Sequence, residues 1–218
     1  MAKVAIVGLG RFGLATAKEI MDSGGEVLAM DADPGIIARH DGEFSVLVRL
    51  DARDRDALRA QGLEHMDAVV MAIGEDVEAS VLATDHLKQL GCRRVIARAK
   101  TGTLGHILKR VGADEVVYPE DQTARRIAQQ ILHPGLADFV DVGGGYALAR
   151  AAVTEKMVGQ PLLEAVGETR LHLAAILVER KASGGRIDSL LPDEETRVEA
   201  GDRLLLLGRP GDLEKWPA

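Results

Sequence analysis

The sequence is poor in cysteine, in aromatic residues and in positive charge. Its single cysteine, Cys92, excludes an internal disulfide and a cysteine-rich zinc site, as in proteins of the reducing cytosol. Aromatic residues make up 3% of the chain, so its cores must be aliphatic. The formal net charge of -7 is the wrong sign for docking onto nucleic acid, and we expect no nucleic-acid partner.

Long hydrophobic runs are also missing. The longest runs, such as residues 68–73, suit buried strands, because a helix that spans a bilayer needs about 18 apolar residues. We therefore expect a cytoplasmic protein. Its 218 residues suffice for one large or two modest domains, since a domain averages about 100 to 200 residues.

Through the first 130 residues, short β-branched runs alternate with segments of helical period. The expected strands lie at 4–7, 27–30, 45–48, 68–72, 94–97 and 115–117. The expected helices lie at 12–22, 35–39, 55–60, 77–90, 104–111 and 120–132. This alternation predicts an α/β fold, a Rossmann-like doubly wound parallel sheet covered by helices on both faces.

The pattern changes at His133-Pro134-Gly135, which ends the last helix. Beyond it we expect strands at 139–142, 147–154, 172–179 and 203–207, a helix at 161–166, and a hairpin turn at Gly184-Gly185. The sequence thus predicts a nucleotide-binding domain over 1–133, a linker over 134–145 and a smaller α+β domain over 146–218. A core so small gains stability by pairing with a second copy.

The first predicted turn carries the motif GLGRFG. It follows a strand, opens a helix and precedes an acidic residue about 20 positions on, the context that makes a glycine fingerprint specific for nucleotide phosphates. The first glycine permits the tight turn, the second lets the backbone approach phosphates, and the third lets the helix lie close to the sheet. Its candidate binding residues are Gly8, Leu9, Gly10, Arg11, Phe12 and Gly13.

Further candidates follow the other strands, because ligands of open α/β sheets bind at the carboxyl ends of the strands. Asp31 suits the ribose hydroxyls and would repel the 2′-phosphate of NADP, whereas Asp33 suits either a ligand or a helix cap. The remaining candidates are Asp51, Ala52, Ile73, Gly74 and Arg98. Alternatively, these loops are rich in polar residues only because helices start there.

Two charged residues near these loops are notable. From the sequence alone, Arg11 either pairs with the phosphates of a nucleotide or extends into solvent. Glu120 follows Pro119, an arrangement typical of an acidic helix start.

Several ordered motifs together resemble one family. GLGRFG, DSGGEVLAMDAD, AIGEDVEASVLATDHLK, VIARAK and LKRVGADEVVYPED resemble the RCK or TrkA N-terminal domain of Trk and Ktr potassium-uptake systems. VGQPLLEAV and IDSLLPDEETRVEAGDRLLLLG resemble the TrkA C-terminal domain of the same proteins. The chain is most similar to Ktr-type subunits, which have one copy of each domain.

The resemblance implies a non-enzymatic, nucleotide-sensing regulatory subunit at the inner face of the cell membrane. Its partners would be a membrane potassium-translocating subunit and other copies of itself, as dimers in a ring expected to be octameric. In the family ATP and ADP compete for the site, and NAD or NADH binds as well. The family's arginine at the position that matches Arg11 reaches the terminal phosphate. The family's glutamate at the position that matches Glu120 helps to bind a cation such as sodium, magnesium or calcium.

The sequence departs from the family at two site positions. Arg98 stands where relatives often carry lysine, and Leu50 precedes Asp51 where many relatives have glycine, which affects the approach to adenine. Some relatives bind cyclic di-AMP through the C-terminal domain, but LHLAAILVER lacks their polar pair, so nothing here supports that ligand.

An NAD-dependent oxidoreductase or a redox-sensing repressor is the main alternative. An oxidoreductase needs a proton donor or acceptor, yet the six histidines are scattered and no catalytic motif surrounds them. A repressor needs a basic face and a helix-turn-helix, and neither is evident.

Overall fold

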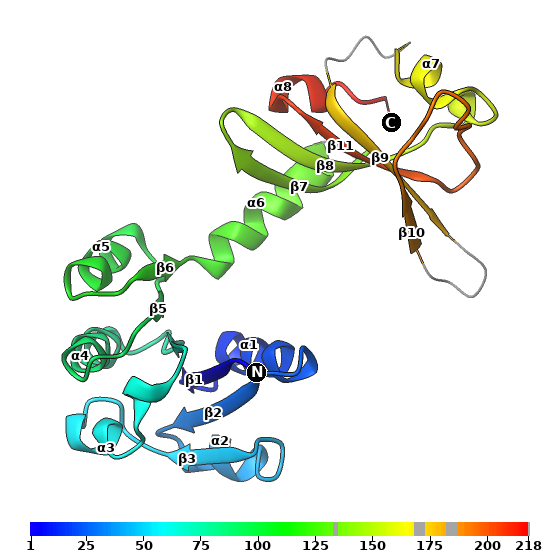
Figure 1. Cartoon of the computed structure of the whole chain (residues 1–218). Helices are drawn as coiled ribbons and strands as arrows, with labels where there is room; N and C mark the ends of the chain where they lie inside the picture. Colours follow the sequence, from blue (N-terminus) through cyan, green and yellow to red (C-terminus); the bar gives the residue numbers. More distant parts are fainter. Residues whose placement is uncertain (133–134, 168–172, 182–186, 218) are drawn as a thin grey trace. The chain divides into compact units, whose positions relative to one another are not determined.

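Six strands of the N-terminal half lie parallel in one sheet, in the order β3-β2-β1-β4-β5-β6 (Figure 1). The computed structural model of the chain describes residues 1–132, 135–167, 173–181 and 187–217. The strands are β1 Lys3–Val7, β2 Glu26–Asp31, β3 Val46–Arg49, β4 Ala68–Met71, β5 Val95–Arg98 and β6 Glu115–Val117. The order reverses between β1 and β4, which confirms the predicted doubly wound sheet.

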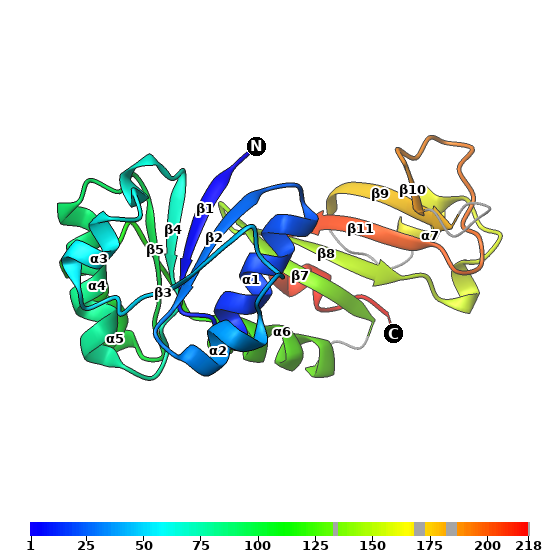
Figure 2. The same cartoon turned by 90° about the horizontal axis from the view of Figure 1, so that it is seen from below.

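Two buried clusters cover the two faces of this sheet. In β1, Ala5 and Val7 belong to one cluster and Val4 and Ile6 to the other, because side chains alternate along a strand. One face is covered by α3 Arg55–Arg59, α4 Val77–Gln89 and α5 Gly102–Arg110, and the other by α1 Arg11–Asp22 and α2 Pro34–Arg39 (Figure 2). A short 3₁₀ turn, η1 Leu63–His65, precedes β4. Apolar residues on both sides of each strand are therefore required.

Side-chain caps begin most helices of this half. Asp33, Asp54, Asp76 and Thr101 each accept a hydrogen bond from a backbone N–H of the first turn. Each cap satisfies a donor that has no partner within its helix. Helix α1 differs, because its N-cap is Gly10 and no side chain accepts a hydrogen bond there. The N–H groups at the start of α1 are thus left for another acceptor.

The C-terminal half contains an antiparallel five-stranded sheet in the order β10-β9-β11-β8-β7. Its strands are β7 Leu136–Gly143, β8 Tyr146–Ala152, β9 Leu173–Lys181, β10 Ile187–Leu190 and β11 Arg203–Gly208. The helical segments are η2 Glu155–Met157, α7 Leu162–Gly167 and α8 Pro210–Leu213. Its largely aliphatic core includes Trp216, whose indole N–H donates to the Ala152 carbonyl at 2.9 Å. The predicted second α+β fold is confirmed.

The chain divides into two compact units, Met1–Asp121 and Gln122–Ala218. Helix α6, Pro119–Leu132, begins in the first unit and ends in the second. It has 14 residues, and within the described ranges no helix is both long and apolar enough to cross a bilayer.

The structure differs from the sequence prediction between the halves. Most of the expected linker, 134–145, is strand β7, which pairs with β8 and forms an edge of the second sheet. The second unit also begins before the predicted boundary at 133. The sequence pattern does not predict β10 or α8, and the expected turn at Gly184-Gly185 lies outside the described residues.

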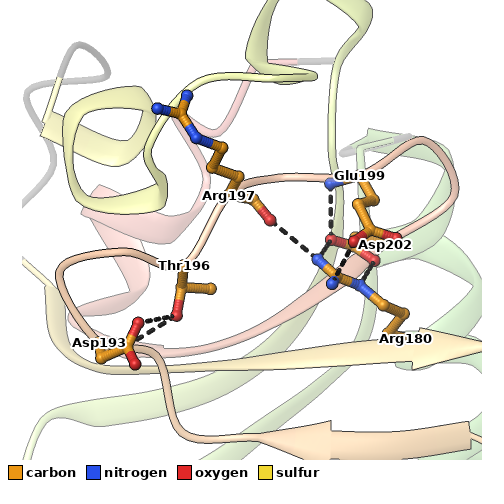
Figure 3. Close-up of polar contacts among 6 residues, drawn as sticks. All are labelled: Arg180, Asp193, Thr196, Arg197, Glu199 and Asp202. Carbon is orange, nitrogen blue, oxygen red and sulfur yellow. Dashed lines mark hydrogen bonds and ion pairs between the residues drawn. The ribbon is translucent and has the colours of Figure 1, made fainter.

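A buried ion pair holds the loop before β11 against β9 (Figure 3). The Arg180 guanidinium donates to both carboxylate oxygens of Asp202, at 2.9 and 2.8 Å, and to the Arg197 carbonyl at 2.8 Å. The Asp202 side chain is 1% exposed and also accepts the Glu199 N–H at 2.8 Å. Burial alone would raise the pKa of Asp202, but these donors outweigh burial and lower it.

Candidate nucleotide-binding site

The glycine loop joins β1 to α1 in the way that the motif predicts. Gly8 has a φ of +96°, a left-handed backbone that disfavours side chains, and a Cβ there would lie 3.0 Å from the Ile73 nitrogen. At Gly13 a Cβ would overlap the carbonyl oxygen of Gly8, so glycine lets α1 start directly against the loop. A Cβ at Gly10 would meet no atom within 4 Å. The backbone of Gly10 is therefore open to a ligand.

Asp31, at the end of β2, is bonded to the glycine loop. Its Oδ2 accepts the Leu9 N–H at 2.6 Å, and its Oδ1 accepts the Asp33 N–H at 2.8 Å. Each oxygen keeps acceptor capacity for a ribose hydroxyl. Asp33 is the N-cap of α2 and accepts the Gly35 N–H at 2.7 Å. Of the two roles expected for Asp33, ligand binding or helix capping, this contact is the capping one. Asp31 thus positions the loop and remains able to bind a sugar.

After β3, Asp51 forms an ion pair with Arg53. The Arg53 Nη2 lies 2.7 Å from Asp51 Oδ2, and its Nη1 lies 3.9 Å from Asp76 at the start of α4. Hydrogen bonds from Arg53 hold the pKa of Asp51 below its usual value. Ala52 and Leu50 are buried members of the core, so their side chains are turned into the protein. Asp51 and Arg53 are the polar side chains at this position that an adenine ring could contact.

Arg98, the last residue of β5, places its positively charged guanidinium, largely shielded from solvent, at this edge of the sheet. Its side chain is 14% exposed, and its guanidinium carbon lies 5.9 Å from the centre of the Phe12 ring. Its Nη1 occupies the space that a Cβ on Gly74 would need. Its Nε is buried and meets no acceptor in the part of the chain that the structure describes. Arg98 thus connects the glycine loop with the loop after β4.

Glu120, in the first turn of α6, is the carboxylate partner of Arg98. Its Oε1 accepts a hydrogen bond from Arg98 Nη2, although the glutamate side chain is 59% exposed. Its own backbone N–H and the Arg98 guanidinium hold the pKa of Glu120 below its usual value. Among the described residues no three His, Cys, Asp or Glu side chains gather as a metal site. A cation at Glu120 would therefore need ligands from elsewhere, such as phosphate oxygens.

Two more cations stand near this edge. Lys100, two residues after β5, pairs with Glu75, and this pair lowers the pKa of Glu75, to which Arg98 and Arg11 also contribute. The side chain of Arg11, at the start of α1, is exposed and makes no hydrogen bond or ion pair with any described residue. Cations beside the uncapped start of a helix form an environment suited to phosphates.

All of the predicted site residues lie at or just beyond the carboxyl ends of the parallel strands, but they form two groups. One group comprises the glycine loop, Asp31, Ile73, Gly74, Arg98 and Glu120, which contact one another. Asp51 contacts Arg53 instead. The sequence pattern does not single out Arg53, Glu75 or Lys100. Their position within four residues of a strand end is the signal that identifies them.

Comparison with known families and proteins gives consistent matches. The TrkA-N domain model matches residues 4–119. A Ktr system potassium uptake protein A from Vibrio alginolyticus is 34% identical over 208 residues, which cover 94% of this chain and 91% of that protein. A Ktr system potassium uptake protein C from Bacillus subtilis is 29% identical over 212 residues, covering 97% and 94%.

Solved structures share the fold. The structure titled "GsuK channel bound to NAD" is 15% identical with a TM-score of 0.62, over 97% of this chain and 38% of that chain. The GsuK RCK domain is 22% identical with a TM-score of 0.54, over 99% of this chain and 45% of that chain. The chain spans less than half of each, and at this identity the similarity concerns the fold alone.

Proposed function

The chain belongs to the TrkA-N domain family, and from this premise we propose that it is a nucleotide-sensing regulatory subunit of a potassium uptake system. Its Ktr relatives match almost the whole chain, and their names support the assignment to a potassium uptake system. The proposed subunit is not an enzyme. It acts in the cytoplasm, at the inner face of the membrane, on a potassium-translocating subunit.

The observation that carries the nucleotide part of this proposal is the group of three cations that share Glu75, beside the uncapped start of α1. Arg11, Arg98 and Lys100 come from α1 and from the end of β5, at the edge where ligands of doubly wound sheets bind. We assign ATP and ADP as the principal ligands, with NAD or NADH as alternatives. ATP has one more phosphate than ADP, so its contacts with Arg11 can favour a different conformation.

The assembly follows from the same proposal. We assign the unit Met1–Asp121 to nucleotide binding and the unit Gln122–Ala218, which includes β7, to the C-terminal domain, with dimers that join into a ring. Glu120 can take part in holding a sodium, magnesium or calcium ion against the phosphates. The ion would also relieve the repulsion between its carboxylate and a triphosphate.

The experiment is a titration of the purified full chain with ATP, ADP, NADH and NADPH, followed by melting temperature and particle size. We expect stabilisation by ATP and ADP, a different particle size in each, and weaker binding of NADPH because Asp31 repels its 2′-phosphate. Arg11→Ala should lower the affinity for ATP by about tenfold, because a charge-assisted hydrogen bond to phosphate is lost. It should lower the affinity for NADH by less. Arg93→Ala, which removes another exposed arginine, is the matched control.

Two results would overturn the proposal. One is indifference of the protein to all adenine nucleotides, and the other is hydride transfer from NADH to a substrate. Equal losses of ATP and NADH affinity in Arg11→Ala would remove the terminal-phosphate role of that residue alone.

A further inference from the structure

The two side chains of the Arg98–Glu120 ion pair differ in their exposure to solvent. The Arg98 side chain is 14% exposed and is enclosed by Phe12 and Gly74, whereas the Glu120 side chain is 59% exposed. The glutamate can therefore return to water by a side-chain rotation, at little cost in solvation. The arginine cannot leave without vacating its place between the glycine loop and the loop after β4.

The pair also leaves Arg98 incompletely satisfied. A guanidinium has five N–H donors in a planar fork, and Glu120 accepts from Nη2 while Nε meets no acceptor in the described part of the chain. A buried donor without a partner is unfavourable. A phosphate group can accept from Nε and Nη2 together, in the bidentate geometry that arginine favours. A phosphate is thus a better partner for Arg98 than Glu120 in its present position.

We propose that Glu120 is an internal competitor of the ligand, a carboxylate that occupies the phosphate-binding guanidinium of Arg98 until a nucleotide phosphate displaces it. This inference rests on the proposed binding of nucleotides at the glycine loop. It gives Glu120 a role in the ligand-free protein that a helix start or a cation ligand does not require. The released carboxylate lies in the first turn of α6 and would then be free to meet a cation.

The physical consequence is a fixed loss of affinity for any ligand whose phosphates reach Arg98. Breaking the pair costs the same free energy whichever phosphate replaces it. Ligands without a phosphate do not break the pair and lose nothing. Glu120 therefore lowers the affinity of ATP and ADP and leaves that of adenosine unchanged.

The test is calorimetric titration of the full chain with ATP, ADP and adenosine in EDTA, so that no divalent cation can bind Glu120. Glu120→Gln removes the charge and keeps the shape, and should raise the affinity for ATP and ADP about fivefold, as for an ion pair whose carboxylate is exposed. In an Arg98→Met background the same change should have no effect. Glu115→Gln is the matched control, because it breaks the 2.8 Å Arg94–Glu115 pair at the opposite ends of β5 and β6.

The outcomes separate this inference from the proposed function. Unchanged or weaker ATP binding by Glu120→Gln in EDTA would overturn the competitor role while leaving nucleotide binding intact. So would an equal gain for adenosine, or the same gain in Glu115→Gln. If the parent protein binds neither ATP nor ADP, the proposed function fails and the inference fails with it. Melting curves of each variant show that the comparison is made between folded proteins.

Discussion

At the scale of single residues, the glycines of GLGRFG serve two separable purposes. Gly13 is required by the protein itself, because any Cβ there would overlap the Gly8 carbonyl oxygen. Gly10 is not, since its φ of -64° and ψ of 179° suit any residue and a Cβ would meet no atom within 4 Å. The fold therefore leaves the backbone of Gly10 accessible, as the proposed approach of phosphates requires.

Alanine substitutions separate the two purposes. Gly13→Ala should lower the free energy of unfolding by about 1 to 3 kcal/mol, the range for forced overpacking. Gly10→Ala should leave stability nearly unchanged and weaken ATP binding by about tenfold, because its methyl group blocks the approach of phosphate to the backbone. Urea denaturation and ATP titration of both variants provide the measurement. A Gly10→Ala protein that binds ATP like the parent would contradict this explanation.

Some residue roles follow from local sequence and others do not. Asp33 accepts from an N–H two residues ahead, so spacing predicts its capping role. The free Cys92 is a buried filler, and burial raises the pKa of its thiol to about 11. By contrast, Arg98 and Glu120 are 22 residues apart. Their pairing depends on the parallel register of β5 with β6, which no spacing rule provides.

At the scale of elements, the strands of the first sheet are predictable because they are buried on both faces. Runs such as VAIV and AVVM are buried throughout and have no polar alternation. Strand β7 is different, because it lies at a sheet edge and only Leu136 in it is buried. Its sequence, LADFVDVG, carries two aspartates and a glycine, which are rare in strands. For this reason the sequence predicts only the stretch 139–142 of β7 as a strand and places it in a linker, whereas the strand starts at Leu136 and belongs to the second sheet.

The connection from β9 to β11 gives an element-scale prediction. Asp202→Asn removes the carboxylate that Arg180 holds in a site 1% exposed, and should lower the free energy of unfolding by about 3 kcal/mol near neutral pH. The folded-state pKa of Asp202 lies below its ordinary value of 3.8. Its ionised form therefore stabilises the fold above that value, and this contribution is lost as the pH falls through the folded-state pKa.

The difference in unfolding free energy between parent and Asp202→Asn should thus be constant near pH 7 and narrow below about pH 4. Urea denaturation at a series of pH values measures it. The matched control is Glu194→Gln, an exposed carboxylate of the same loop, which should change little at any pH. A difference that stays constant down to pH 2 would contradict the assignment of Asp202 as the titrating group.

At the scale of the whole molecule, the buried residues form cores that do not mix the two units. The two clusters on the parallel sheet draw only on residues of Met1–Asp121, and the third draws only on Gln122–Ala218. The proposed nucleotide site, from the glycine loop to Glu120, belongs entirely to the first unit. Ligand binding and the Arg180–Asp202 pair should therefore stabilise different parts of the chain.

Calorimetric unfolding tests this division. We expect two transitions, because each unit has its own core. ATP at about 100 times its dissociation constant adds about 2.7 kcal/mol to the unit that binds it, and should raise one transition only. Asp202→Asn should lower the other transition only. A single transition that responds to both changes would show that the two units unfold as one cooperative body, and that a nucleotide bound at the glycine loop also stabilises the antiparallel sheet.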